Sequence, residues 1–337
     1  MHKKIYLSVI LGILFFVSCK DKKQYYEESG TVFHTLYTIK YEAPHILTDK
    51  IDAELQKFNL SLNPFNPNSI IAKVNNNEAV EVDEWFTEVF NKSMEVSRNS
   101  DGVFDITCAP LVNLWGFGFN KKDSVTPAMI DSLKTFVGYR KVHLEGKKVV
   151  KDDPRLLLNC SAIAKGYSCD VIARLLEKEG VENYMILIGG EVVVKGVNQN
   201  GVCWRTGINL PEDDPDGIKN NYDEIVQLCK KGAIATSGNY RNFYIKDGKK
   251  YAHTIDPRTG YPAEQSVLSA TIVANDCMTA DAYATAFMAM GLEKARQMAD
   301  SLPEIEYYVI YADENGKHQI EYSKGMLQYL SLIHISE

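Results

Sequence analysis

The segment CMTADAYATAFMAMG, residues 277–291, predicts a helix that is apolar on nearly every side. Asp281 lies inside that surface, and a buried carboxylate needs an ion pair, a hydrogen bond or a metal. Thr285 follows one turn later on the same face. A carboxylate and a hydroxyl are hard oxygen ligands that suit Mg²⁺. In the alternative interpretation, Thr285 bonds back to its own helix and Asp281 pairs with a lysine or acts as a cap.

A second group of candidates lies in LLLNCSAIAKGYSCD, residues 156–170. The pattern predicts a strand, a turn near Ser161, and a helix with Lys165 and Gly166 in its first turns. Backbone N–H groups at a helix start bind anions, lysine adds positive charge, and glycine permits close approach. The upstream glycines of a P-loop are missing. An ordinary helix start with an exposed Lys165 is therefore the alternative.

The third candidate is His253 in YAHTIDPRTGYP, residues 251–262. Side chains alternate along a strand, so we expect Tyr251, His253 and Ile255 to share one face just before a turn that ends near Gly260. A histidine fixed there can serve as an acid, a base or a phosphate donor. A structural, hydrogen-bonded histidine is the alternative.

Residues 103–120, VFDITCAPLVNLWGFGFN, are apolar but interrupted by Pro110, Gly116 and Gly118. This pattern is typical of neither a regular helix nor a strand. Aromatic and glycine residues together predict a pocket wall where a flat group approaches the backbone. The four segments together indicate a hard metal, a phosphate and an aromatic slot, and hence a site for a bulky phosphorylated cofactor.

The remaining pattern predicts a single α+β domain over residues 30–330, with mainly antiparallel sheets and flanking helices. The expected elements are a strand at 30–42, a helix at 47–63 with Thr48 as N-cap, a helix at 83–102, a helix near 127–138, a charged hairpin before 157, a strand with a Gly-Gly bend at 183–196, hairpins with turns at Asn200-Gly201 and Asp247-Gly248, a strand at 266–274 and a last strand at 324–330.

Composition narrows the class of protein. The chain has 337 residues and a formal charge of −7, which argues against nucleic acid as a partner. Six cysteines beyond Cys19 show neither CxxC nor zinc-ligand spacing. We expect all six to be buried small hydrophobes, although an exported protein allows one disulfide. They are Cys108, Cys160, Cys169, Cys203, Cys229 and Cys277.

The N-terminus predicts export. A basic start precedes an apolar run shorter than the roughly 20 residues of a membrane span, so residues 1–18 are interpreted as a signal peptide. FVSC resembles a lipobox, which predicts lipidation of Cys19 and a tether over residues 19–29; a plain secretory signal is the alternative. We therefore expect a lipid-anchored protein that faces the periplasm. Residues 331–337 fit no element and are interpreted as a non-native tail.

Six segments in order resemble the ApbE family, the FAD:protein FMN transferases. They are FDITCAPLVNLWGFG, SAIAKGYSCD, LIGGEV, ATSGNYRNF, HTIDPRTGYP and TADAYATAF, and the resemblance extends over residues 30 to about 327. It implies an ApbE-like, T-fold-related domain. It also implies Mg²⁺-dependent transfer of FMN from FAD to a threonine hydroxyl of a target protein, with release of AMP.

The resemblance also implies roles for single residues. Asp281, Thr285 and the backbone carbonyl of Ala162 would bind the metal, and His253 matches the histidine of the family's H-x-I-D-P motif. A metal-bound Asp281 is a poor base, so between the two candidates His253 is favoured as catalytic base. The implied flavin contacts are Ser29, Phe65, Val103, Phe104, Asp105, Asn159, Lys165 and Ile255.

Three positions depart from the family pattern: Ser29 replaces a common Met, Phe65 a Tyr and Asn159 an Asp. The last change removes a negative charge near the adenosine or the metal. Two other functions fit the same residues. One is an FAD pyrophosphatase that uses water, and the other is a non-catalytic lipoprotein that binds flavin. For a transferase, we expect the target to be a subunit of a membrane redox complex.

Overall fold

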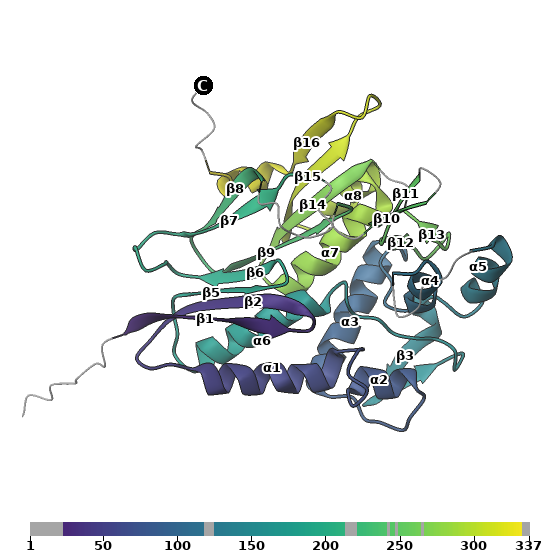
Figure 1. Ribbon diagram of the computed structural model, residues 1–337, viewed down its shortest axis with the longest axis horizontal. Coiled ribbons are helices and arrows are strands. Elements are labelled where there is room, and N and C mark those ends of the chain that lie inside the picture. Colours follow the sequence, from purple (N-terminus) through teal and green to yellow (C-terminus); the bar gives the residue numbers. More distant parts are fainter. Residues whose placement is uncertain are drawn as a thin grey trace, which may run out of the picture.

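An eight-stranded sheet, antiparallel throughout, organises the computed structural model, which describes residues 23–117, 125–212, 221–240, 243–246, 249–263 and 266–331. Its order is β1-β2-β5-β6-β9-β14-β15-β16 (Figure 1). This sheet with its helices confirms the α+β prediction. The bounds are β1 Gln24–Val32, β2 Thr35–Ala43, β5 Tyr184–Ile188, β6 Glu191–Lys195, β9 Gly232–Gly238, β14 Val267–Ala274, β15 Ile305–Ala312 and β16 His318–Tyr322.

Helices cover one face of this sheet (Figure 1). Helix α7 packs directly on β9 and β14, and α6 packs on α7, β5 and β6. Every residue of α7 except Thr285 is buried, which confirms the prediction of an apolar, enclosed helix. The bounds are α1 Thr48–Leu62, α2 Ile70–Asn75, α3 Glu84–Asn99, α4 Ala109–Leu114, α5 Pro127–Lys134, α6 Ala164–Lys178, α7 Cys277–Met290 and α8 Leu292–Ala299.

A second layer covers the opposite face of the sheet. Strands β7, Trp204–Asn209, and β8, Tyr222–Leu228, form a two-stranded sheet whose apolar side chains pack on Val192 and Val194 of β6. Val193 points to the helical side instead, as the alternation of a strand requires. Both faces of the sheet are therefore buried at β6.

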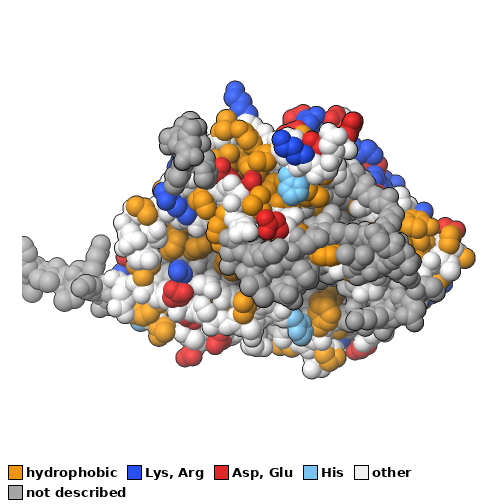
Figure 2. Space-filling model, turned by 45° about the horizontal axis from the view of Figure 1, so that its top comes forward, with side chains coloured by type: hydrophobic (Ala, Val, Ile, Leu, Met, Phe, Trp, Pro, Cys, Tyr) orange, Lys and Arg blue, Asp and Glu red, His pale blue; other side chains and the backbone are white. Residues whose placement is uncertain are grey.

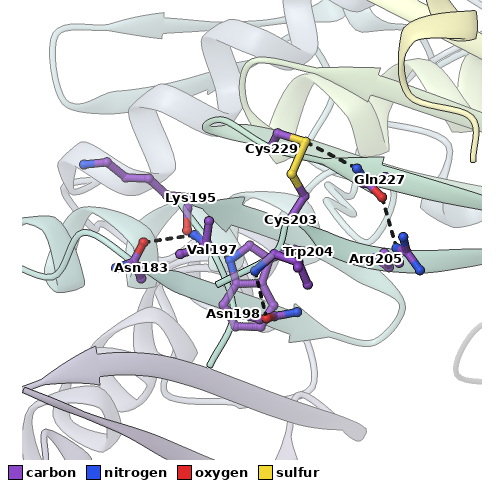
Figure 3. The surroundings of a disulfide bond; sticks show 10 residues. Asn183, Lys195, Val197, Asn198, Cys203, Trp204, Arg205, Gln227 and Cys229 are labelled. Carbon is purple, nitrogen blue, oxygen red and sulfur yellow. Dashed lines mark hydrogen bonds between the residues drawn. A yellow bond between two sulfur atoms is a disulfide. The ribbon is translucent and has the colours of Figure 1, made fainter. Parts of the chain in front are cut away.

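A disulfide joins Cys203 to Cys229 beside the ends of β7 and β8 (Figure 3). The expectation that all six cysteines are buried hydrophobes is wrong for this pair. Cys203 and Cys229 are 26 residues apart in sequence, and the pairing of Trp204 with Leu228 brings their sulfur atoms together. Their spacing alone does not predict a disulfide. The free cysteines among the described residues are Cys108, which is half-buried, and the buried Cys160, Cys169 and Cys277.

The predicted strand over residues 30–42 is instead a hairpin. Phe33 and His34 adopt left-handed φ values of 51° and 61° and connect β1 to β2. The alternating pattern continues on both sides of this turn, and no glycine or proline marks it. Because β1 begins at Gln24, residues 24–29 belong to the sheet and not to the predicted tether. The predicted signal peptide over residues 1–18, Cys19 and residues 332–337 lie outside the described residues.

Other local predictions need correction. Thr48 is the first residue of α1, and the N-cap is Leu47 with no side-chain hydrogen bond. Residues 156–159 do not form the predicted strand. The Asn75 side chain bonds the backbone there, since it donates to Leu158 O (2.9 Å) and accepts from Leu158 N (2.7 Å). Residues 324–328 form a 3₁₀ helix in place of the last strand.

Short strands complete the fold. They are β3 Val142–Glu145 and β4 Lys148–Lys151, β10 Phe243–Lys246 and β11 Lys249–Ala252, and β12 Ile255–Asp256 and β13 Tyr261–Pro262. The face shown in Figure 2 carries hydrophobic patches interspersed with charged side chains of both signs. In the described part of the chain, no helix combines the length and the apolar character needed to cross a membrane.

Removal of the disulfide should destabilise the fold. Replacing Cys203 and Cys229 with serine opens a covalent loop spanning 26 residues of sequence, which should lower the free energy of unfolding by about 3 kcal/mol. Urea denaturation measures the change. Wild-type protein treated with a reductant should show the same loss, and an unchanged midpoint after complete reduction would contradict the prediction.

Candidate functional site

A cavity of about 530 Å³ gathers residues from distant parts of the chain. Its size is typical of small-molecule sites. The start of α6, the middle of α7, the end of β9 and residues 103–117 form its walls. All of the predicted site residues between 65 and 285 line it: Phe65, Val103, Phe104, Asp105, Asn159, Ala162, Lys165, His253, Ile255, Asp281 and Thr285.

Ser29 does not line this cavity. It lies in β1 with its side chain exposed, and its hydroxyl is 3.2 Å from the hydroxyl of Thr38 across the β1–β2 hairpin. The turn of that hairpin comes closer to the site, because the ring of His34 contacts the ring of Phe65 at 5.4 Å. The structure thus separates Ser29 from the other predicted flavin contacts.

The close crossing of α6 and α7 places Asp281. The N–H of Gly166 donates to Asp281 Oδ2 (2.9 Å). A Cβ on Gly166 would lie 2.2 Å from the carbonyl oxygen of Cys277 and 2.7 Å from Asp281 Cβ, so only glycine fits. One turn further along α6, Asp170 accepts from the N–H groups of Cys277 (2.9 Å) and Met278 (2.8 Å). These contacts fix the register of the two helices.

Three charged side chains meet in the cavity wall. Asp281 is only 3% exposed, and burial raises the pKa of its carboxyl group while nearby Lys165 lowers it. Lys165 forms an ion pair with Glu191, the first residue of β6. Burial alone lowers the pKa of Lys165, but Asp281 and Glu191 together raise it above its ordinary value. The ammonium group of Lys165 thus pairs with Glu191 and is also influenced by the charge of Asp281.

The donors around Asp281 fit a divalent cation. Thr285 is the one α7 residue that is not buried, and its hydroxyl lies 3.3 Å from that of Ser237 on β9. Among the described residues, the only hydrogen bond seen at Asp281 engages Oδ2. With the carbonyl of Ala162, which also lines the cavity, the set is carboxylate, hydroxyl and carbonyl oxygen. These hard oxygens suit Mg²⁺. Because Glu191 pairs with Lys165, the carboxylate of Asp281 supplies negative charge for the cation.

No cluster of three or more acidic, histidine or cysteine ligands occurs within the ranges that the structure describes. A transition-metal centre of that kind is therefore absent from those ranges. A cation at Asp281 would depend on the mixed oxygen set and on ligands from a bound substrate, as is usual for Mg²⁺.

The Asp105 carboxylate is used within the protein. Its Oδ1 accepts from the N–H and the hydroxyl of Thr107, and its Oδ2 accepts from the N–H of Tyr139, each at 2.7 Å. Burial raises the pKa of this carboxyl group despite those bonds. Asp105 therefore shapes the loop that carries Val103 and Phe104 into the cavity wall.

His253 lies in a bend between β11 and β12, so the predicted alternation of Tyr251, His253 and Ile255 along one strand is wrong. The β10–β11 pairing ends before His253. After it, Ala263 N donates to Thr254 O (2.9 Å), at the open end of the small β12–β13 hairpin. The His253 ring still reaches the cavity, where it meets the ring of Phe117 edge-on at 6.4 Å.

Asn159 keeps the local structure that an aspartate would give. Its Oδ1 accepts from the N–H of Ser161 (2.9 Å), and its backbone N–H donates to Ile106 O (2.7 Å). The amide adds a donor where a carboxylate would add negative charge. The substitution therefore changes the electrostatics of the cavity without removing the turn before Ala162.

Several residues that line the cavity have no role predicted from their type or spacing. Glu191 was present in the segment LIGGEV, and the β9 residues in ATSGNYRNF, but only as parts of a resemblance. An acidic residue at the start of a strand looks like any exposed position until Lys165 is placed beside it. The residues concerned include Gly189, Glu191, Thr236, Ser237, Gly238 and Tyr240.

Comparison with known proteins assigns the family. The model of the ApbE family matches residues 33–309. The chain belongs to the ApbE family. The FAD:protein FMN transferase of Vibrio cholerae is 35% identical over 322 residues, covering 92% of this chain and 95% of that protein. The protein of the same name from Escherichia coli K12 is 32% identical over 314 residues, with 87% and 88% covered.

Solved structures of ApbE proteins share the fold. The flavin transferase ApbE of Vibrio cholerae superposes with a TM-score of 0.82 at 33% identity, covering 92% of this chain and all of that one. The ApbE protein of Thermotoga maritima gives 0.79 at 28% identity, covering 91% of this chain and 100% of that one. The predicted ApbE-like fold is confirmed.

The α6–α7 crossing of this ApbE family member can be tested with one methyl group. Gly166→Ala places a Cβ against backbone atoms of Cys277 that cannot move cheaply, so the free energy of unfolding should fall by about 2–3 kcal/mol. Chemical denaturation measures it. Gly232→Ala is the matched control, because its Cβ would meet only ordinary contacts at 3.7 Å or more. Equal stability of the two variants would refute this account of the crossing.

Proposed function

We propose that the protein is an FAD:protein FMN transferase that cleaves the pyrophosphate of FAD in the presence of Mg²⁺. It attaches FMN to a threonine hydroxyl of a target protein and releases AMP. Family membership supports transferase activity, as do relatives that carry this name. The observation that carries the proposal is the meeting of Asp281, Thr285 and Lys165 in the wall of one cavity.

Asp281, Thr285 and the Ala162 carbonyl would hold the cation. When bound, Mg²⁺ offsets the negative charge of the pyrophosphate. Lys165 serves the same substrate group from the start of α6, where its side chain remains 34% exposed. Its ammonium can bind a phosphate oxygen next to the proposed cation site, because Lys165 and Asp281 lie near each other in the cavity lining.

The other walls suit the flavin. Phe104, Phe117 and Tyr240 line the cavity, and aromatic faces stack on a flat ring system. Phe65 lies at the rim and is 53% exposed. The threonine of the target would have to approach the FMN phosphorus in line with the departing AMP. A fixed cavity promotes that alignment.

The attacking hydroxyl must lose a proton. Asp281 is a poor proton acceptor for two reasons. The N–H of Gly166 already donates to its Oδ2, and its Oδ1 is the proposed ligand of the cation. His253 lines the same cavity and carries a ring nitrogen that can accept a proton. We therefore assign His253 as the general base of the transfer step.

We also propose that the protein is exported and anchored at Cys19 by lipid, facing the periplasm, and that its target is a subunit of a membrane redox complex. The disulfide between Cys203 and Cys229 supports export, since such bonds persist in oxidising compartments. The signal-like residues 1–18 support the same location.

The transfer reaction is tested with FAD, Mg²⁺ and a target-domain fragment, followed by gel fluorescence for covalently bound flavin. Wild-type protein should label the fragment, and Asp281→Asn should abolish both labelling and FAD cleavage. Asparagine keeps an acceptor for Gly166 but loses the charge. Asp276→Asn is the matched control, because it changes the N-cap of the same helix and leaves the cavity wall intact. Full activity of Asp281→Asn would refute the metal assignment.

The products of the same assay separate the alternatives. Free FMN without a labelled fragment would identify an FAD pyrophosphatase, in which water takes the place of threonine. FAD that stays intact after long incubation with Mg²⁺ would identify a flavin-binding protein without catalysis. Either result would overturn the transferase proposal.

His253→Ala should lower kcat about 100-fold, the scale of general base catalysis. Stopped assays of flavin transfer measure it at saturating FAD. His143→Ala is the control, since His143 lies on β3, is exposed and lies 3.2 Å from Glu145, outside the cavity lining. A loss of less than threefold would show that His253 has a structural role.

A further inference from the structure

Lys165 lies under the influence of two carboxylates but bonds to only one of them. Its ammonium pairs with Glu191, while Asp281 raises its pKa through space. The Glu191 side chain is 4% exposed, and its Oε2 has no hydrogen-bond partner among the described residues. A buried carboxylate oxygen without a partner is costly. The fold accepts that cost to keep a carboxylate at this position.

The β5–β6 turn enforces the pair. Gly189 has a φ of +69°, and a Cβ there would lie 3.1 Å from Lys165 Cδ and 3.2 Å from Glu191 Oε2. The turn therefore passes close to the stem of Lys165 and places Glu191 beside the ammonium. Cys169 of α6 also donates to the backbone carbonyl of Glu191 (3.5 Å), which ties β6 to the same helix.

The charge balance explains why Glu191 matters. Without it, Asp281 would be the remaining carboxylate known to act on Lys165. An ammonium bonded to Asp281 would occupy the oxygen that a cation needs and would repel that cation. The Glu191 pair leaves Asp281 with its backbone hydrogen bond and one further oxygen.

We propose that Glu191 is a positioning residue that holds the Lys165 ammonium away from Asp281 and so keeps Asp281 open to a divalent cation. This proposal rests on the proposed function only for the cation site. It assigns Glu191 no contact with the reacting atoms. It also gives a reason for the Gly-Gly turn, which lets Glu191 and Lys165 meet.

The test measures cation binding directly, apart from catalysis. Mn²⁺ is titrated into purified protein, with and without FAD, and free Mn²⁺ is followed by electron paramagnetic resonance. Glu191→Gln should weaken Mn²⁺ binding about tenfold or more, the scale on which a neighbouring charge shifts a carboxylate's equilibria. Lys165→Met combined with Glu191→Gln should restore the affinity at least to the wild-type value, because no ammonium remains to occupy Asp281.

Glu28→Gln is the matched control. Glu28 is also buried, bonds to Tyr41 and lies outside the cavity lining, and its Oε2 has no hydrogen-bond partner within the described ranges. Its substitution should leave Mn²⁺ affinity unchanged. Thermal unfolding of all variants identifies losses that come from the fold, and the rescue by Lys165→Met cannot arise from a damaged fold.

A crystal structure of the Glu191→Gln variant supplies the second readout. Lys165 Nζ should lie within hydrogen-bonding distance of Asp281. The proposal is overturned if Nζ stays near residue 191, or if wild type and Glu191→Gln bind Mn²⁺ equally; the metal assignment then stands. If wild-type protein binds no Mn²⁺ with FAD present, the metal assignment itself fails and this proposal fails with it.

Discussion

The contact between the N–H of Gly166 and the carboxylate of Asp281 is the constraint on which the site depends. It requires the backbones of α6 and α7 to approach until no Cβ fits between them. Asp170 reinforces the approach by accepting two N–H groups from the start of α7. Because every residue of α7 except Thr285 is buried, the core fixes its position, and Asp281 shares that rigidity. A preorganised carboxylate can then serve a ligand without rearrangement.

Much of this site could be predicted from the sequence, because strong local patterns encode it. The apolar surface around Asp281 marks α7, and Thr285 one turn later marks the side that is left open. The position of Lys165 at the start of α6 could also be predicted from the local sequence pattern. Long, strongly periodic segments are where such reasoning is most reliable.

The parts that escaped prediction depend on contacts between distant segments. The turn at Phe33 and His34 interrupts no alternation, and the disulfide needs the β7–β8 pairing to bring its cysteines together. The bend at His253 lies between the β10–β11 hairpin and the β12–β13 hairpin. Glu191 can be recognised as the partner of Lys165 only in the folded protein, where the β5–β6 turn lies against α6. In each case the physical cause lies in the tertiary structure, which no local window contains.

The charges of the cavity connect these findings to the departures from the family pattern. The Lys165–Glu191 pair is neutral as a unit, so it adds no net attraction for a cation. Asn159, where an aspartate is common in the family, keeps the turn before Ala162 but contributes no charge. Among the proposed cation ligands, Asp281 then supplies the negative charge that attracts a cation. Any contact that diverts its carboxylate would remove that attraction, and for this reason the partner of Lys165 matters to the proposed cation site.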